Sequence, residues 1–488
     1  MKLKFIILVL MLILCIFFVT LDKSEGMRRL ALSIINPYSP LEASEKTNIN
    51  SEEKVWKDPR GLFPIFAFNL PDSSKNLSES LRIIERCGIN IIINGNYSWM
   101  PNPYKIKDAF EKLGQTNLKW LVVLENECKD DFVYCNSNDK TNKNITDLLK
   151  TFNKSFVYGY YIWDEPGRNI QYCSPFNLKP NDDFVDINRM SIQIRADSSL
   201  NDKLDFVNLF PTYWEGTKTF QDYEKYIDAF INSMTFKPQV LCFDHYPFLK
   251  EEFGGFRKDF FANLEIIRKK SYQYNIPFWM IILSSEHLDY KNLTFEEISF
   301  QAYSALAYGA KGIGYYIFSK SWEHYGYRSW IFEKNFDDSS LPDSLYGELF
   351  PSVKNLNFRI QSIGKFLIDK YNYDIIHLSN GPNNQNMIQP KFISNDSLFV
   401  IDKDFSDKDV FAGLFGDENE ASKKYILLVN KNFELKRKIY LRLKKNAEIK
   451  KFNPSEGKYI YLKKANEILI EIPPASGELF EFKFDDFK

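Results

Sequence analysis

From residue 61 to about residue 330, short apolar runs alternate with amphipathic stretches along the chain. The stretches between the runs repeat apolar residues at intervals of three and four, as Leu81 and Ile84 do, which is the period of a helix with one buried face. Strands that alternate with helices indicate a parallel sheet covered by helices. We predict strands at residues 63–69, 89–94, 120–124, 157–163, 205–210, 240–244, 278–283 and 312–318, and helices at 79–86, 106–113, 145–152, 184–196, 221–231, 260–273 and 295–308.

Eight strands with intervening helices match the usual size of an α/β (β/α)8 TIM barrel. An open, doubly wound sheet is the competing architecture, and it normally carries a glycine-rich turn after its first strand. Here that strand is followed by Asn69-Leu70-Pro71-Asp72, which has no glycine. We therefore predict a barrel over residues 59–370, closed by a helix at about 349–370.

After about residue 372 the pattern changes to short strands separated by polar turns, with no helix among them. The predicted strands are 397–402, 425–430, 438–443, 467–472 and 479–484. This pattern is typical of a small antiparallel β-sandwich. We assign it to residues 371–488.

The chain begins with an apolar run at residues 5–21, preceded by Lys2 and Lys4 and followed by polar residues. Such a segment is a signal peptide or a membrane anchor, and its length leaves both possibilities open. We assign residues 1–26 to it and residues 27–58 to a linker. The chain is therefore expected outside the cytoplasm, either secreted or anchored to the membrane.

The cysteines beyond the leader number five and have no metal-type spacing. Cys128, Cys135 and Cys173 lie in polar, loop-like stretches and could supply one disulfide in an oxidising compartment. Cys87 and Cys242 lie in apolar surroundings, which predicts buried thiols.

Net charge and composition narrow the class of partner. The formal net charge is −1, which provides no overall field to attract a polyanion, so nucleic acid is not expected as a partner. Aromatic residues make up 16% of the chain, enough to fill the core and also to line a carbohydrate cleft, where flat sugar faces pack on aromatic rings.

Carboxylates stand where several barrel strands end, which is where TIM-barrel enzymes carry their catalytic groups. An apolar strand runs directly into Asp164-Glu165-Pro166, Asp244 ends the sixth strand, and Glu286 follows the seventh. Two carboxyl groups are what glycosidic bond cleavage requires, one to protonate the leaving oxygen and one to act as nucleophile or to activate water. Ordinary loop charges or helix caps are the structural alternative.

The residues that other TIM-barrel reactions require were not found in the sequence. No glycine-rich phosphate turn follows the seventh strand, no close histidine pair suits zinc, and Lys320 lies among polar loop residues instead of an apolar pocket. We therefore expect no metal or cofactor, and a carbohydrate substrate. Candidate sugar-binding residues at or near strand ends are Asn94, Trp99, Glu125, Asp164, Tyr213, Trp214, Asp244, His245, Tyr246 and Trp322.

The segment Gly159-Tyr160-Tyr161-Ile162-Trp163-Asp164-Glu165-Pro166 resembles the fourth-strand acid/base motif of clan A glycoside hydrolases, and the likeness is strongest to barrel proteins related to family-42 β-galactosidases. Asp244-His245-Tyr246-Pro247 and the stretch 301–313 support it, over roughly residues 61–330. The resemblance implies that Glu165 is the acid/base and Glu286 the nucleophile, about 5–5.5 Å apart in the retaining geometry. It also implies a raised pKa for Glu165, beside a second carboxylate and the apolar wall of Trp163. Asp164 departs from the clan, which has asparagine there.

Two alternatives remain open. If Asp244 faced Glu165 across about 6.5–9.5 Å, the enzyme would invert instead. A noncatalytic barrel that binds glycans at the cell surface would need no second carboxylate at all. The position of Glu286 relative to Glu165 separates catalysis from binding.

Overall fold

The computed structural model describes residues 57–71, 74–94, 103–123, 149–167, 182–377, 399–401, 409–417 and 419–484. The predicted leader and most of the linker lie outside these residues, as do Cys128, Cys135 and Cys173. In the part of the chain that is described, no helix combines the length and the apolar character that crossing a membrane requires.

Eight parallel strands, each hydrogen-bonded to the next, close into a barrel when β8 pairs with β1. Residues at Ile65 and Ala67 on β1 lie opposite Ile313 and Tyr315 on β8, which completes the ring. The strands are β1 (Ile65–Phe68), β2 (Ile91–Asn94), β3 (Lys119–Val123), β4 (Val157–Asp164), β5 (Leu204–Leu209), β6 (Leu241–Asp244), β7 (Phe278–Leu283) and β8 (Ile313–Tyr316).

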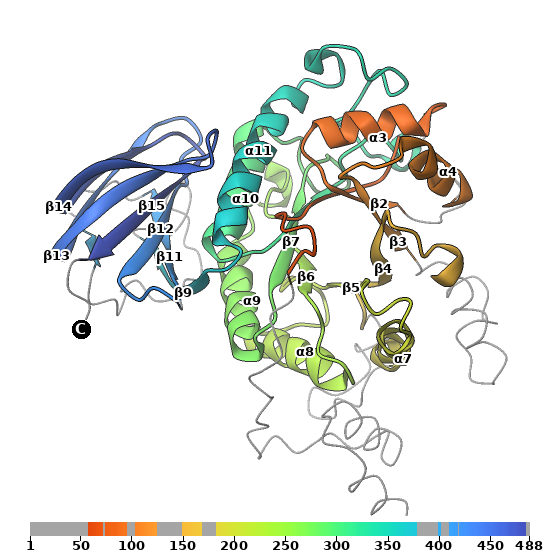
Figure 1. The fold of residues 1–488 in the computed structure, drawn as a ribbon, viewed down its shortest axis with the longest axis horizontal. Coiled ribbons are helices and arrows are strands. Elements are labelled where there is room, and N and C mark those ends of the chain that lie inside the picture. The colour runs from red at the N-terminus through yellow and green to blue at the C-terminus, as the bar shows by residue number, and fades with distance from the viewer. Residues whose placement is uncertain are drawn as a thin grey trace, which may run out of the picture.

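Helices surround the barrel (Figure 1). They are α3 (Leu77–Arg86), α4 (Pro103–Leu113), α7 (Asp182–Ala196), α8 (Phe220–Ser233), α9 (Phe260–Tyr274), α10 (Phe295–Ala307) and α11 (Phe350–Leu367). Thr219 before α8 and Thr294 before α10 each form a capping box, in which the threonine side chain accepts from the third backbone N–H of the helix. The strands and helices predicted in the described part of the barrel are confirmed, with edges that differ by a few residues.

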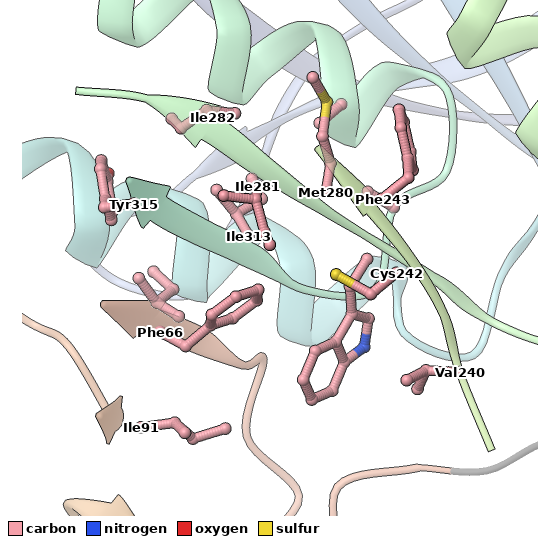
Figure 2. Close-up of a cluster of buried hydrophobic side chains, with 14 of the residues drawn as sticks. Phe66, Ile91, Val240, Cys242, Phe243, Met280, Ile281, Ile282, Ile313 and Tyr315 are labelled. Atoms are coloured by element: carbon pink, nitrogen blue, oxygen red, sulfur yellow. The ribbon is translucent and has the colours of Figure 1, made fainter. Parts of the chain in front are cut away.

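Large aromatic side chains fill the interior of the barrel, as the tight curvature of eight strands requires. The rings of Phe66, Phe206 and Trp279 contact one another with centroids 5.4 to 5.9 Å apart. Figure 2 shows part of this core, with Phe66 from β1 and Cys242 from β6 among the labelled side chains. Gly314 on β8 makes room for it, because a Cβ there would lie 2.1 Å from the Phe66 ring. Cys87 and Cys242 are buried free thiols, as predicted.

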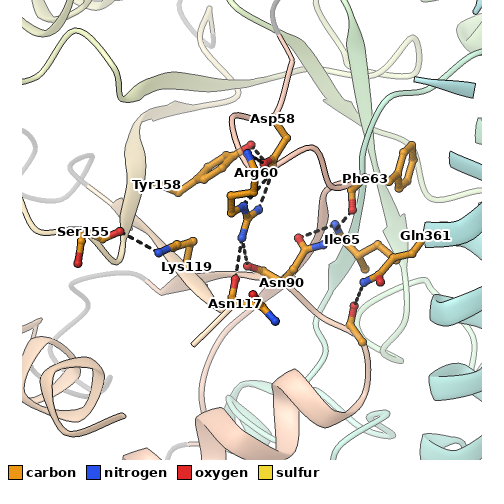
Figure 3. Close-up of polar contacts among 11 residues, drawn as sticks. Asp58, Arg60, Phe63, Ile65, Asn90, Asn117, Lys119, Ser155, Tyr158 and Gln361 are labelled. Carbon is orange, nitrogen blue, oxygen red and sulfur yellow. Dashed lines mark hydrogen bonds and ion pairs between the residues drawn. The ribbon is translucent and has the colours of Figure 1, made fainter. Parts of the chain in front are cut away.

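A polar cluster closes the end of the barrel where the strands begin (Figure 3). The Arg60 guanidinium forms an ion pair of 2.6 Å with the buried Asp58 carboxylate and donates to the backbone oxygens of Asn90 and Asn117. The Tyr158 hydroxyl donates to the same carboxylate over 2.9 Å. Every charge in this floor cluster, which consists of Asp58, Arg60, Asn90 and Tyr158, therefore has a partner.

The C-terminal strands form an antiparallel sheet in the order β10-β13-β15-β12-β11-β9, with β14 paired to β13. They are β9 (Tyr371–His377), β10 (Phe399–Ile401), β11 (Val410–Gly416), β12 (Lys423–Asn430), β13 (Arg437–Asn453), β14 (Lys458–Ile472) and β15 (Gly477–Phe484). The β13–β14 pairing shifts register after Arg442, so the first part of β13 pairs with β10 and the second part with β15. The predicted barrel followed by a small β-sandwich is confirmed.

The sandwich has its own apolar core and packs against the helices that close the barrel (Figure 1). The Ser299 hydroxyl on α10 donates to Ala475 O over 2.6 Å, and the Tyr308 hydroxyl lies 2.8 Å from His377 Nε2. Strands β9 and β11 were not predicted from the sequence. Strand β9 mixes Asn and Asp into its apolar run, and β11 is buried on both sides and contains two glycines, so neither shows the alternation that marks an exposed strand.

Candidate active site

The C-terminal end of β4 is irregular, and this irregularity changes the direction in which its last side chains point. The pairing with β5 shifts register between Tyr161 and Trp163, so β4 contains a bulge. Residues three apart on a regular strand point to opposite faces, but across the bulge the Tyr161 hydroxyl reaches Asp164 and donates to its Oδ1 atom over 2.6 Å. Asp164 therefore stays on the same side of the sheet as Tyr161, whose ring packs on Phe68 and Phe206 inside the barrel.

Glu165 follows in a left-handed conformation, with a backbone φ of +49°. A non-glycine residue holds this conformation at a cost, so the surroundings must fix it. The Glu165 N–H donates to the Asn208 carbonyl over 2.8 Å, and the Tyr226 hydroxyl donates to the carbonyl of Pro166 over 2.9 Å. The turn that carries Glu165 is thus held by β5 and α8.

Asn208 on β5 joins the end of β4 to the end of β6. Its side-chain Nδ2 donates to Asp164 Oδ1 over 3.0 Å and to Asp244 Oδ1 over 2.9 Å. Both Asn208 and Asp244 are 3% exposed. Asp164, Glu165, Asp244 and Asn208 form one group at the mouth of the barrel, which we term the acid cluster.

The acid cluster concentrates negative charge. Burial raises the pKa of the Asp244 carboxyl well above its usual range, the charges of Glu165 and Asp164 raise it further, and the Asn208 hydrogen bond opposes both. Among the described residues, neither Asp164 nor Asp244 forms an ion pair with a cation. Carboxyl groups held together without a cation are a common sign of an active site.

Glu286 lies after β7 in a different environment. Its backbone exchanges two hydrogen bonds with Arg328 of the loop after β8, at 2.9 and 2.8 Å. Its Oε1 atom lies 3.4 Å from Lys250 Nζ, and its side chain is 28% exposed. In the described part of the chain no hydrogen bond joins Glu286 to the acid cluster, so the predicted pairing with Glu165 stays a prediction.

Aromatic side chains from the ends of β6 to β8 gather beside these carboxyl groups. Tyr246 stacks on Tyr316 with ring centroids 5.5 Å apart, and the hydroxyls of Tyr316 and Tyr327 lie 2.8 Å apart. His287 stacks on the Tyr327 ring at 4.5 Å. Burial lowers the pKa of His287 to about 4, an effect that the nearby Lys250 charge reinforces against the hydrogen bond to Ser285, so this ring is neutral at pH 7.

The structure brings together some of the predicted sugar-binding residues and buries others. Tyr213 lies beneath the Arg257 guanidinium, 3.8 Å from its ring centroid, and its ring contacts His245. His245 is fully buried, and burial lowers its pKa although Asp259 lies 3.5 Å away. Trp214 stacks on Phe210 at 4.4 Å.

Trp322, at 8% exposure, packs with Tyr316 and Tyr327. The predicted residues Trp99 and Glu125 lie outside the described residues, as does the side chain of Asn94 at the end of β2. No group of three or more His, Cys, Asp or Glu side chains in the described ranges is arranged to hold a metal ion.

The main residue that the sequence prediction missed is Asn208. The signal was present, because Asn208 is a polar residue two positions after Phe206 in the apolar run LDFVNL and therefore faces the barrel interior. Tyr161 and His287 were missed because a tyrosine in a strand and a histidine in a loop have ordinary structural roles.

Comparison with known proteins shows similarity in structure and not in sequence. No protein-family model matches the chain, and no curated protein matches it. A β-galactosidase from Bacillus circulans sp. alkalophilus superposes with a TM-score of 0.54 at 9% identity, covering 86% of this chain and 99% of that one. A catalytic mutant of a family-42 β-galactosidase from G. stearothermophilus gives 0.51 at 8%, covering 88% and 100%.

A third β-galactosidase, from Rahnella sp. R3, gives a TM-score of 0.50 at 9% identity, covering 87% of this chain and 98% of that one. The chain shares the fold of family-42 β-galactosidases. The resemblance predicted from the end of strand β4 is therefore confirmed for the fold, and at these identities the family-42 likeness extends to the fold alone.

Proposed function

We propose that this chain is a glycoside hydrolase of the retaining type, with Glu165 as the acid/base and Glu286 as the nucleophile. The observation that carries the proposal is the acid cluster, in which Glu165 stands beside Asp164 and is coupled by charge to Asp244 at the C-terminal end of the barrel. The fold of family-42 β-galactosidases supports it, because enzymes of this architecture place their chemistry at that end.

The two proposed catalytic residues differ in their charged neighbours. Glu165 has two further carboxyl groups around it, and its charge is one of those that raise the pKa of the Asp244 carboxyl. Glu286 has the Lys250 ammonium group 3.4 Å away, a suitable partner for a carboxylate nucleophile. Opposite environments for two carboxyl groups are what an acid and a nucleophile need.

In the proposed reaction Glu165 gives its proton to the glycosidic oxygen while a Glu286 oxygen attacks the anomeric carbon. The bond to the leaving alcohol breaks, and a covalent glycosyl ester forms on Glu286. Glu165, now ionised, takes a proton from a water molecule while the water oxygen attacks the anomeric carbon. The ester bond to Glu286 breaks and the sugar is released, which leaves Glu286 as a carboxylate and Glu165 protonated again.

Substrate contacts follow from the residues around the cluster. Asp164 can accept a hydrogen bond from a sugar hydroxyl through its oxygens, and Tyr213, Tyr246, Trp214 and Trp322 offer aromatic faces or hydroxyls near the mouth. His245, which is fully buried, acts by supporting the Tyr213 ring.

An inverting reaction is the second candidate, and one observation favours it. Asp244, not Glu286, is the carboxyl group that the structure links to Asp164 through Asn208 and to Glu165 by charge. Its burial argues for a supporting role, since a catalytic base must reach a water molecule. The anomer released first, followed by NMR, separates the two mechanisms.

The test is a screen of nitrophenyl glycosides, β-galactosides included, with the wild-type enzyme and the variants Glu165→Gln, Glu286→Gly and Asp244→Asn. We expect Glu286→Gly to lose activity and to regain it with azide, which replaces the missing nucleophile. Full activity in Glu165→Gln would eliminate the central assignment. Glycan binding without hydrolysis of any glycoside would favour the noncatalytic barrel.

We also propose that the enzyme acts outside the cytoplasm, on the basis of the apolar run at residues 5–21. Cell fractionation with a C-terminal tag tests this proposal. Recovery of the full-length chain in the cytoplasmic fraction would contradict it.

A further inference from the structure

Asn208 makes three contacts with the ends of two different strands. Its carbonyl accepts from the Glu165 N–H, and its side-chain Nδ2 donates one hydrogen bond to Asp164 and one to Asp244. In the barrel, Asn208 lies directly opposite Asp164 in the pairing of β5 with β4. The two carboxylate oxygens that share its amide group therefore lie within about 6 Å of each other.

The orientation of the Asn208 amide follows from its neighbours. Its NH2 group has two hydrogens, and each finds a carboxylate oxygen. The reverse orientation would place the Oδ1 atom against the Asp164 carboxylate, where acceptor faces acceptor. Only an amide at this position can give a hydrogen bond to each of two acids and add no charge of its own.

We propose that Asn208 is a positioning residue for the hydrolysis proposed above: it fixes Asp164 and Glu165 at the end of β4 relative to Asp244 on β6. The proposal rests on the proposed function. The role assigned to Asn208, which lies on β5, is to hold the proposed catalytic residue and not to contact the substrate.

The proposal explains why a glutamate can stand in a left-handed conformation. Such a conformation persists only where several contacts determine it, and the Asn208 carbonyl supplies one of them directly. The Asn208 side chain supplies a second indirectly, because it holds the preceding residue, Asp164. Loss of the amide would leave Asp164 held by the Tyr161 hydroxyl alone and would leave Asp244 without its side-chain donor.

Several titratable groups face the cluster, and the pH dependence belongs to all of them together. They are Asp164 and Glu165 at the end of β4, Tyr213 after β5, Tyr223 and Tyr226 on α8, Cys242 on β6, Tyr246 after β6, and Tyr290 and Tyr327 after β7 and β8. The tyrosines and the cysteine keep their protons at neutral pH because burial raises the pKa of each.

The first test variant is Asn208→Asp, which has almost the same shape and replaces the donor with another carboxyl group. We expect kcat to fall by about 10- to 100-fold with KM within about threefold, and the alkaline limb of the kcat/KM profile, where the general acid loses its proton, to move to higher pH by about half a unit or more. Asn90→Ala is the matched control, because Asn90 is an equally buried asparagine at the opposite end of the barrel, where its side chain bonds only backbone groups. It should lose thermal stability and keep both kcat and the pH profile.

The double variant Asn208→Asp with Asp244→Asn separates positioning from simple structural support. The exchanged pair can again form an amide-to-carboxylate bond between β5 and β6, so the melting temperature should recover. Asp164 would still face a carboxyl group at position 208 and lack the amide donor of the wild type, so kcat should stay low. Recovery of kcat together with stability would overturn the proposal, as would an Asn208→Asp variant with wild-type kcat and pH profile.

Failure of this inference and failure of the proposed function give different results. If Glu165→Gln abolishes hydrolysis while Asn208→Asp leaves kcat and the profile unchanged, only the role of Asn208 is refuted. If Glu165→Gln is as active as the wild type, the proposed function itself is refuted.

Discussion

The barrel carries a buried polar cluster at each end, and the two clusters handle charge in opposite ways. At the floor, the Asp58 carboxylate is fully enclosed and is paired with Arg60 and with the Tyr158 hydroxyl. The remaining guanidinium hydrogens are donated to backbone oxygens. At the mouth, the carboxyl groups of Asp164 and Asp244 share the Asn208 side-chain amide, and neither has a cationic partner among the described residues.

Under the proposed function, we infer from this difference that the floor serves stability and the mouth serves chemistry. A buried ion pair with all its hydrogen bonds satisfied specifies one arrangement and resists change. A buried group of like charges destabilises the folded chain, and it persists where function requires shifted protonation. Substitutions at the floor should therefore affect stability, and substitutions at the mouth should affect activity.

The largest effect is expected for Glu165→Gln. Removal of the general acid should lower kcat/KM by about 10²- to 10⁴-fold, because the leaving oxygen would depart unprotonated. Thermal stability should not fall, since the change removes a carboxyl group from a crowded site. Steady-state kinetics and thermal melting measure the two quantities, and the exposed Glu434→Gln variant in the sandwich is the control. A large drop in melting temperature would show instead that Glu165 stabilises the fold.

Arg60→Ala is the corresponding change at the floor. It leaves the Asp58 carboxylate buried without its cation, which should cost about 3–5 kcal/mol of unfolding free energy. Urea unfolding measures this loss. The kcat of the fraction that remains folded should equal the wild-type value. A reduced kcat would show that the floor cluster affects the geometry of the acid cluster.

Asp244→Asn should make the protein more stable at neutral pH. The folded-state pKa of Asp244 is raised, so the folded chain holds a proton that the unfolded chain releases above about pH 4, and stability falls as pH rises. The variant cannot titrate at this position, so we expect it to gain about 1–3 kcal/mol over the wild type at pH 7 and progressively less as the pH approaches 4. Urea unfolding at several pH values measures the gain. A difference that does not change with pH would contradict the raised pKa.

The sequence predicted the framework better than it predicted these contacts. Strand β7 (Phe278–Leu283) was predicted with its observed bounds, because a fully buried strand of a parallel sheet is a continuous apolar run. Glu165 was predicted as a site residue because an apolar strand runs directly into Asp-Glu-Pro, and this assignment stays a prediction. The link from Asp164 through Asn208 to Asp244 could not be predicted, because it depends on the register of three strands and on a bulge at Ile162 that no local pattern marks.

The smallest expected effects concern two tyrosines of β4. Each donates a hydroxyl hydrogen bond to an aspartate, one at the floor of the barrel and the other at the mouth. Tyr158 donates to Asp58 over 2.9 Å, and Tyr161 donates to Asp164 over 2.6 Å. Tyr158→Phe should lower the unfolding free energy by about 1 kcal/mol and leave kcat unchanged, since it removes one buried hydrogen bond. Tyr161→Phe removes an equivalent bond, but it should lower kcat several-fold with a smaller loss of stability, because Asp164 is then oriented by Asn208 alone. The pair shares strand, residue type and substitution, so equal effects on both quantities would refute the division between a structural floor and a catalytic mouth.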